Sequence, residues 1–127
     1  MGTANQEWTT VRTFTGASAD SAGLPSSSSM VSVRGTGPKG LPHLVELTLS
    51  GCSTTGSPTS VLIDIFREVG GVVDYLTTWV ISATDITNAK VSPLIAECHA
   101  SRVYAKVSFS GGTSPTFTGA LRARAVE

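Results

Sequence analysis

The sequence predicts an all-β protein built as a sandwich of antiparallel strands, and three observations predict it. First, apolar and polar residues alternate in several short runs, and turn residues separate these runs at the spacing typical of a sandwich or barrel. Second, no window of a dozen residues shows a convincing 3.6-residue apolar period. Third, β-branched and hydroxyl residues are frequent, whereas lysine, a common residue of helix surfaces, occurs only three times.

The N-terminal residues 1–29 differ from the rest of the chain. They contain one strand-like stretch, EWTTVRTFT (7–15), followed by GASADSAGLPSSSS, whose small polar residues bury too little apolar surface to become ordered. We therefore expect residues 1–29 to form an extended N-terminal arm with a flexible link, and residues 30–127 to form the sandwich domain. A chain of 127 residues can build one core without a metal or a disulfide.

The first predicted strands of the domain follow Met30. MVSVRG alternates, and the Gly- and Pro-rich GTGPKGLP after it predicts a long turn. HLVELTLS (43–50) alternates most regularly in the first half, and its inward face carries Val45, Leu47 and Leu49.

A hairpin is predicted at SVLIDIFREV (60–69), Gly70-Gly71 and VVDYLTTWVISA (72–83), because Gly-Gly allows the positive φ angles of a two-residue turn. Counting outward from this turn places Asp74 opposite Arg67, which predicts an exposed cross-strand ion pair.

Strict alternation on the second strand of this hairpin places Tyr75 and Trp79 on one face, together with Val73 and Ile81. We interpret this face as core, because contiguous apolar faces are normally buried. The alternative interpretation is a surface on which sugars stack.

A final hairpin is predicted at RVYAKVSFS (102–110) and FTGALRARAV (117–126), across the turn GGTSP. Residues 85–99 before it stay open between a short strand, a helical turn and a loop. The two connections CSTTGSPT and GGTSPT echo each other, which two similar hairpin turns explain. Together the elements predict about seven to eight strands in two antiparallel sheets, with jelly-roll or immunoglobulin-like connectivity.

Charge and hydropathy exclude several classes of partner. Only 14% of residues are charged, nine acidic and nine basic, so the chain has no electrostatic footprint for nucleic acid or anionic lipid. No run approaches the ~20 apolar residues of a membrane span, and the N-terminus lacks the layout of a secretory signal. We expect a soluble protein made in a cytoplasm, with neither nucleic acid nor membrane as a partner.

Groups for catalysis or metal binding are few. The two histidines, His43 and His99, and the two cysteines, Cys52 and Cys98, lack the close pairing of a zinc site. We expect free thiols rather than a disulfide. The Gly-rich stretches precede no helix, so they are turns and not phosphate cradles. The sequence therefore predicts no enzyme, no catalytic residue, no metal and no cofactor.

Four residues are candidates for contacts with a partner. Trp8 and Phe14 lie in the expected arm, where aromatic side chains could engage a neighbouring subunit. Arg122 and Arg124 project from one side of the last strand. They could be a solvated face that prevents aggregation, or could bind a carboxylate of a neighbour.

The segment SRVYAKVSFSGGTSPTFTGALRARAVE resembles the closing hairpin of small β-sandwich proteins carried on tailed-bacteriophage virions. LIDIFREVGGVVDYLTTWVIS is similar to the central strand pair of the same proteins. The resemblance implies a head decoration, cement or other minor virion protein that binds a symmetric shell through loops and arms and often oligomerises.

The functional expectation is therefore a non-enzymatic structural protein of a bacteriophage virion, made in the host bacterial cytoplasm. It would decorate or cement the capsid, with the major capsid protein or other virion subunits as partners and a homo-oligomer as its state. The arm model adds that removal of residues 1–29 leaves a folded domain. The alternative is a carbohydrate- or receptor-binding module of a fibre or tail, with Trp79 and the connections 54–59 and 111–116 as its surface.

Overall fold

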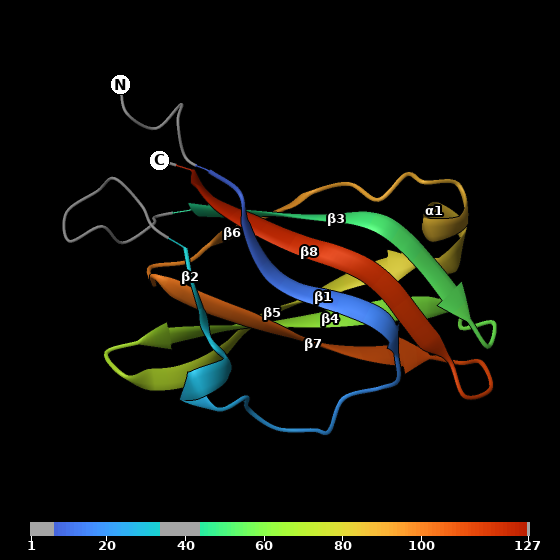
Figure 1. The fold of residues 1–127 in the computed structure, drawn as a ribbon, viewed down its shortest axis with the longest axis horizontal. Helices are drawn as coiled ribbons and strands as arrows, with labels where there is room; N and C mark the ends of the chain where they lie inside the picture. Colours follow the sequence, from blue (N-terminus) through green and yellow to red (C-terminus); the bar gives the residue numbers. More distant parts are fainter. Residues whose placement is uncertain (1–6, 34–43, 127) are drawn as a thin grey trace.

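The computed structural model describes residues 7–33 and 44–126, and it consists of two four-stranded antiparallel sheets packed face to face (Figure 1). The all-β sandwich is confirmed. The strands are β1 (Thr9–Ala17), β2 (Val31–Ser32), β3 (Leu44–Thr55), β4 (Ser60–Val69), β5 (Val72–Ser82), β6 (Leu94–Glu97), β7 (Arg102–Ser110) and β8 (Thr116–Val126). A short helix, α1 (Ala83–Thr87), follows β5, and a 3-10 turn spans Ser27–Ser29.

The strand order identifies the connectivity. The first sheet has the order β1-β8-β3-β6 and the second sheet the order β2-β7-β4-β5. The chain is thus nested: β4 pairs with β5, β3 with β6, β2 with β7 and β1 with β8, all antiparallel. This is the eight-stranded jelly roll, one of the two connectivities that the sequence left open.

The core lies between the sheets. It is made of the residues that point inward at alternate positions along the strands. β4 contributes Val61, Ile63 and Ile65, and β7 contributes Val103 and Val107, each at most 1% exposed. The opposite sheet supplies five more fully buried large side chains, which are Phe14, Val45, Leu47, Phe117 and Leu121, and Val33 after β2 is also fully buried. Among the described residues no polar or charged residue is buried, so apolar packing alone fills the interior.

The predicted N-terminal arm is corrected by the position of β1. Residues 9–17 pair along β8 and form one edge of the first sheet. Two register shifts break the alternation of this strand, and the first, between Thr10 and Arg12, allows Val11 and Phe14 to be buried although they are three residues apart. The sequence pattern therefore concealed a strand of the sandwich inside the region assigned to the arm.

The expected flexible link is also attached to the domain. It runs from the end of β1 across to the second sheet, where the Asp20 amide donates to the Val107 carbonyl (2.9 Å). Further along, the Arg102 guanidinium donates to the carbonyls of Ser27 and Met30 (2.8 and 3.0 Å). The segment is thus anchored at both ends on β7.

The hairpin β4–β5 is confirmed at the predicted turn. Val69 faces Val72, and Gly70 and Gly71 both have positive φ angles, 58° and 82°. Arg67 faces Asp74, and their side chains approach to 3.7 Å at the surface, as the count from the turn predicted.

The predicted shared face of Tyr75 and Trp79 is wrong. A register shift between Ile65/Thr77 and Phe66/Tyr75 inserts an extra residue on β5 at Leu76. Trp79 therefore points into the core, with 8% of its surface exposed, whereas Tyr75 turns to the outer face and is 49% exposed.

The undecided segment 85–99 contains both a helix and a strand. The Ser82 side chain accepts a hydrogen bond from the Asp85 amide and caps α1, and β6 then pairs with the start of β3. The two echoing connections lie side by side at one end of the sandwich, where the Thr113 amide donates to the Gly56 carbonyl (2.8 Å). Neither is a hairpin turn, because the first joins β3 to β4, the second joins β7 to β8, and each crosses between the two sheets. The predicted final hairpin is therefore wrong: β7 pairs with β2 and β4, whereas β8 pairs with β1 and β3. The predicted long turn after Val33 and the start of the 43–50 strand at His43 lie outside the described residues.

Candidate functional site

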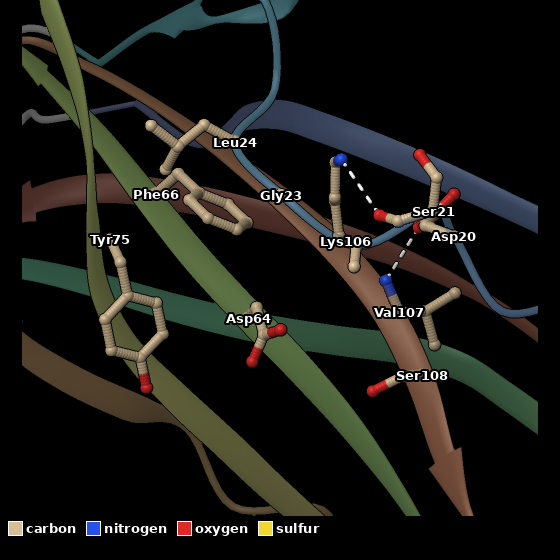
Figure 2. A pocket seen from close by; sticks show the side chains of 11 residues that line it. Asp20, Ser21, Gly23, Leu24, Asp64, Phe66, Tyr75, Lys106, Val107 and Ser108 are labelled. Atoms are coloured by element: carbon tan, nitrogen blue, oxygen red, sulfur yellow. Dashed lines mark hydrogen bonds between the residues drawn. The ribbon is translucent and has the colours of Figure 1, made fainter.

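A groove lies on the outer face of the second sheet, between the sheet and the link (Figure 2). Its floor is formed by side chains of β4, β5 and β7, and its wall by residues 20–24 of the link. The cavity volume is about 380 Å³, within the range of small-molecule sites of about 300–1,000 Å³.

Asp20 fixes the wall of the groove to the edge of β7. The Val107 amide donates to the Asp20 carboxylate (2.7 Å), which also accepts from both terminal nitrogens of Arg12 (2.7 and 3.1 Å). Arg12 reaches further and donates to the Ala105 carbonyl (3.0 Å). The short strand β2 pairs with only two residues of β7. The bonds from Arg12 and Asp20 satisfy backbone groups further along β7, so this part of the sheet edge cannot pair with another strand.

Charge interactions shift the pKa values of this pair. Partial burial alone would raise the pKa of Asp20, but the hydrogen bonds from Arg12 and Val107 and the charges of Arg12 and Lys106 outweigh burial and lower it. Burial also opposes the charged form of Arg12, yet the contact with Asp20 keeps the pKa of Arg12 above its ordinary value. The anchor is therefore an ion pair at neutral pH.

The floor of the groove holds an aromatic ring in a fixed orientation. Phe66, which is 5% exposed, packs edge to face against Tyr75, with 6.1 Å between ring centroids. The Thr78 hydroxyl donates to Asp64 Oδ1 (2.6 Å). Because that bond uses the only hydroxyl proton of Thr78, the Tyr75 hydroxyl must be the donor in the 2.6 Å contact between Tyr75 and Thr78.

The polar groups around this ring come from neighbouring strands. Figure 2 shows the Asp64 carboxylate between Tyr75 and Ser108, with Lys106 beside it. Lys106 is the cross-strand neighbour of Asp64, but its ammonium donates to the Ser21 carbonyl (3.1 Å). Among the described residues, Asp64 Oδ2 has no hydrogen-bond partner. The groove thus offers a carboxylate oxygen, ammonium protons and hydroxyls to a ligand.

The open edge of the second sheet is the other notable surface. β5 has eleven residues, and no described strand pairs with its outer side. Val72 and Val80 on this strand are 66% and 62% exposed, and its single charged residue is Asp74. A long apolar edge with so little charge is a site for strand pairing with another chain.

The four predicted contact residues have different environments. Phe14 is 1% exposed and packs on Phe117 with 5.3 Å between ring centroids, so it is a core residue and the prediction of a partner contact is wrong. Trp8 is 38% exposed, and the Arg124 guanidinium lies 4.6 Å from its ring centroid. Arg124 also pairs with Glu46 (2.9 Å), so it binds carboxylate within its own sheet. Arg122 is exposed.

The cysteines and histidines form no metal site in the part of the chain that the structure describes. Cys52 and Cys98 are free thiols, and burial raises the pKa of both. His99 lies at the surface, and His43 lies outside the described residues. Over the same ranges, 7–33 and 44–126, no helix is long and apolar enough to cross a bilayer.

Comparison with known proteins adds no relative. No protein-family model matches the sequence, and searches of curated proteins and of solved structures find no match. Functional inference therefore rests on the geometry of the groove and of the sheet edge.

Sequence reasoning missed the residues of the groove. Asp64 and Lys106 alternate outward on predicted strands, which was a usable signal for a surface position. No pattern signalled that the bulge at Leu76 turns Tyr75 outward, or that Asp20 brings the link over the sheet.

Proposed function

We propose that this protein is a non-enzymatic structural protein of a bacteriophage virion, which decorates or cements the capsid through subunit contacts. The open edge of β5 is the observation that carries this proposal, because an apolar edge strand of eleven residues calls for a protein partner. Jelly rolls are frequent among viral capsid domains, which agrees with the role that the resemblance implies.

A second copy of the chain is the proposed occupant of this edge. Two β5 strands related by a two-fold axis would run antiparallel, so each copy would satisfy the free backbone groups of the other. The pairing would extend the second sheet across the dimer and bring Val72 and Val80 of both copies into the contact region. The low charge of β5 keeps repulsion between identical strands small.

The test is the native mass in solution together with binding to undecorated heads of the phage that encodes the protein. Wild-type protein should be a dimer or a multiple of a dimer and should co-sediment with the heads. The double variant Val72→Lys/Val80→Lys should be monomeric and lose co-sedimentation by at least about tenfold, because charge on an edge strand opposes pairing.

Thr87→Lys is the control, because it adds a lysine at an exposed residue of α1 and leaves the edge strand β5 unchanged. It should behave as wild type. A wild-type monomer, or a lysine double variant that keeps both dimerisation and head binding, would refute the proposed edge contact. Loss of folding is checked by circular dichroism of each variant.

A second candidate function, a carbohydrate- or receptor-binding module, is favoured by one specific observation, the groove. The surface expected from the sequence lacks its aromatic residue, because Trp79 is buried in the core. The groove on the same sheet offers a different location.

A further inference from the structure

We propose that the groove binds a neutral saccharide, with one pyranose ring stacked on Tyr75 and its hydroxyls bonded to Asp64, Lys106 and Ser108. The proposal develops the second candidate function, and it holds whether or not the protein belongs to a virion. Three properties of the groove support it: a fixed aromatic platform, convergent polar groups and balanced charge.

Tyr75 is a platform for the apolar face of a sugar. About half of its surface is exposed, yet its orientation is set on one side by the ring of Phe66 and on the other by the hydrogen bond to Thr78. The axial C–H groups of a pyranose carry partial positive charge and pack on the negative face of an aromatic ring. Because the ring is held before binding, little side-chain entropy is lost when the sugar stacks.

The polar groups match the hydroxyls that surround a pyranose ring. Asp64 keeps one carboxylate oxygen as an acceptor, since only Oδ1 is used by Thr78. Lys106 has three ammonium protons and uses one on the Ser21 carbonyl. Ser108, which lines the same groove, can both donate and accept. Neighbouring sugar hydroxyls, which also donate and accept, can bridge these groups.

Charge in the groove favours a neutral ligand over an anion or a cation. Asp64 and Lys106 are cross-strand neighbours of opposite charge, and Asp20 is neutralised by its ion pair with Arg12. A phosphate would face the Asp64 carboxylate, and an ammonium ligand would face Lys106. The wall adds the exposed side chain of Leu24, which can cover part of a bound ring.

The experiment is a glycan array followed by an NMR titration of the full chain, with methyl glycosides of glucose, galactose, mannose and N-acetylglucosamine as probes. Glycerol, a polyol without a ring face, is the matched control ligand. At least one glycoside should give saturable shifts of backbone amides confined to residues 20–24, 64–66, 75–78 and 106–108, and glycerol should give none.

Variants separate stacking from structural support. Tyr75→Ala should weaken binding about five- to tenfold, the size of one aromatic contact, whereas Tyr75→Phe keeps the ring and should retain most of the affinity. Asp64→Asn should weaken binding because a charge-assisted hydrogen bond is lost. Ile95→Ala, at an exposed apolar residue of the other sheet, should bind as wild type.

The proposal would be overturned if no glycan or glycoside produced saturable shifts in the groove, or if Tyr75→Ala bound as tightly as wild type. A peptide that binds the groove in preference to every saccharide would overturn it as well. These outcomes are independent of the edge contact, because Val72→Lys/Val80→Lys changes no residue that lines the groove and should still bind the glycoside.

Discussion

Asp20 connects the two sheets, because it binds Arg12 of β1 and the backbone of β7. Its pKa is lowered in the folded protein, so it contributes stability that is fully present above its ordinary pKa of about 3.9 and is lost as the pH falls through the lowered value. Asp20→Asn should lower the free energy of unfolding at pH 7 by about 1–2 kcal/mol. It should also reduce the loss of unfolding free energy at acidic pH, because the carboxylate that becomes protonated there is absent from the variant.

Urea denaturation between neutral and acidic pH measures this effect. Asp85→Asn is the control, because Asp85 is exposed on α1 and makes none of the ion pairs found in the described residues. Its stability profile should run parallel to that of wild type. An Asp20→Asn profile that also runs parallel to wild type would show that Asp20 does not anchor the link.

The two thiols should react at very different rates. Cys98 is fully buried, Cys52 is partly exposed, and burial raises the pKa of both. In the native state an aromatic disulfide reagent should therefore modify Cys52 slowly and Cys98 only after unfolding. The Cys52→Ser variant should show no native reaction and one reactive thiol in denaturant. Rapid native modification of that variant would contradict the burial of Cys98.

At the scale of elements, β1 should be essential to the fold. Removing residues 1–17 would expose the edge of β8 and part of the core around Phe117, so the truncated protein should unfold or aggregate. Phe14→Ala should lower the free energy of unfolding by about 3–5 kcal/mol, whereas Thr13→Ala, at an exposed residue of the same strand, should change it by less than about 0.5 kcal/mol.

Chemical denaturation and circular dichroism measure both effects. A truncated protein with an unchanged spectrum and a cooperative transition would restore the arm model and remove β1 from the essential fold.

Local turn signals predicted one hairpin correctly and another wrongly, because the turn GGTSP joins β7 and β8, which lie in different sheets. The β4–β5 hairpin was predicted with its register, because Gly70-Gly71 sets both the turn and the pairs that follow it. β1 was mistaken for an arm because two register shifts spoil its alternation and a low-complexity segment follows it. The face of Tyr75 was also missed, since a bulge at Leu76 depends on the partner strand and leaves no mark in the sequence.

At the scale of the whole molecule, the two-sheet sandwich could be predicted but its connectivity could not. Jelly-roll nesting is defined by pairs such as β1 with β8 and β2 with β7, which join residues far apart in the chain. The groove could not be predicted from the sequence for the same reason. Its floor comes from three strands and its wall from the link, and only the folded chain brings Asp20 to β7.

The position of β8 between β1 and β3 determines when the first sheet can form. During synthesis β1 is made before the other described strands, and its partner β8 is made after all of them. Until then the edges of β1 and β3 that pair with β8 have no partner strand. We expect slow folding, on the order of milliseconds to seconds as in other all-β proteins of non-local topology, and a period in which the nascent chain depends on chaperones.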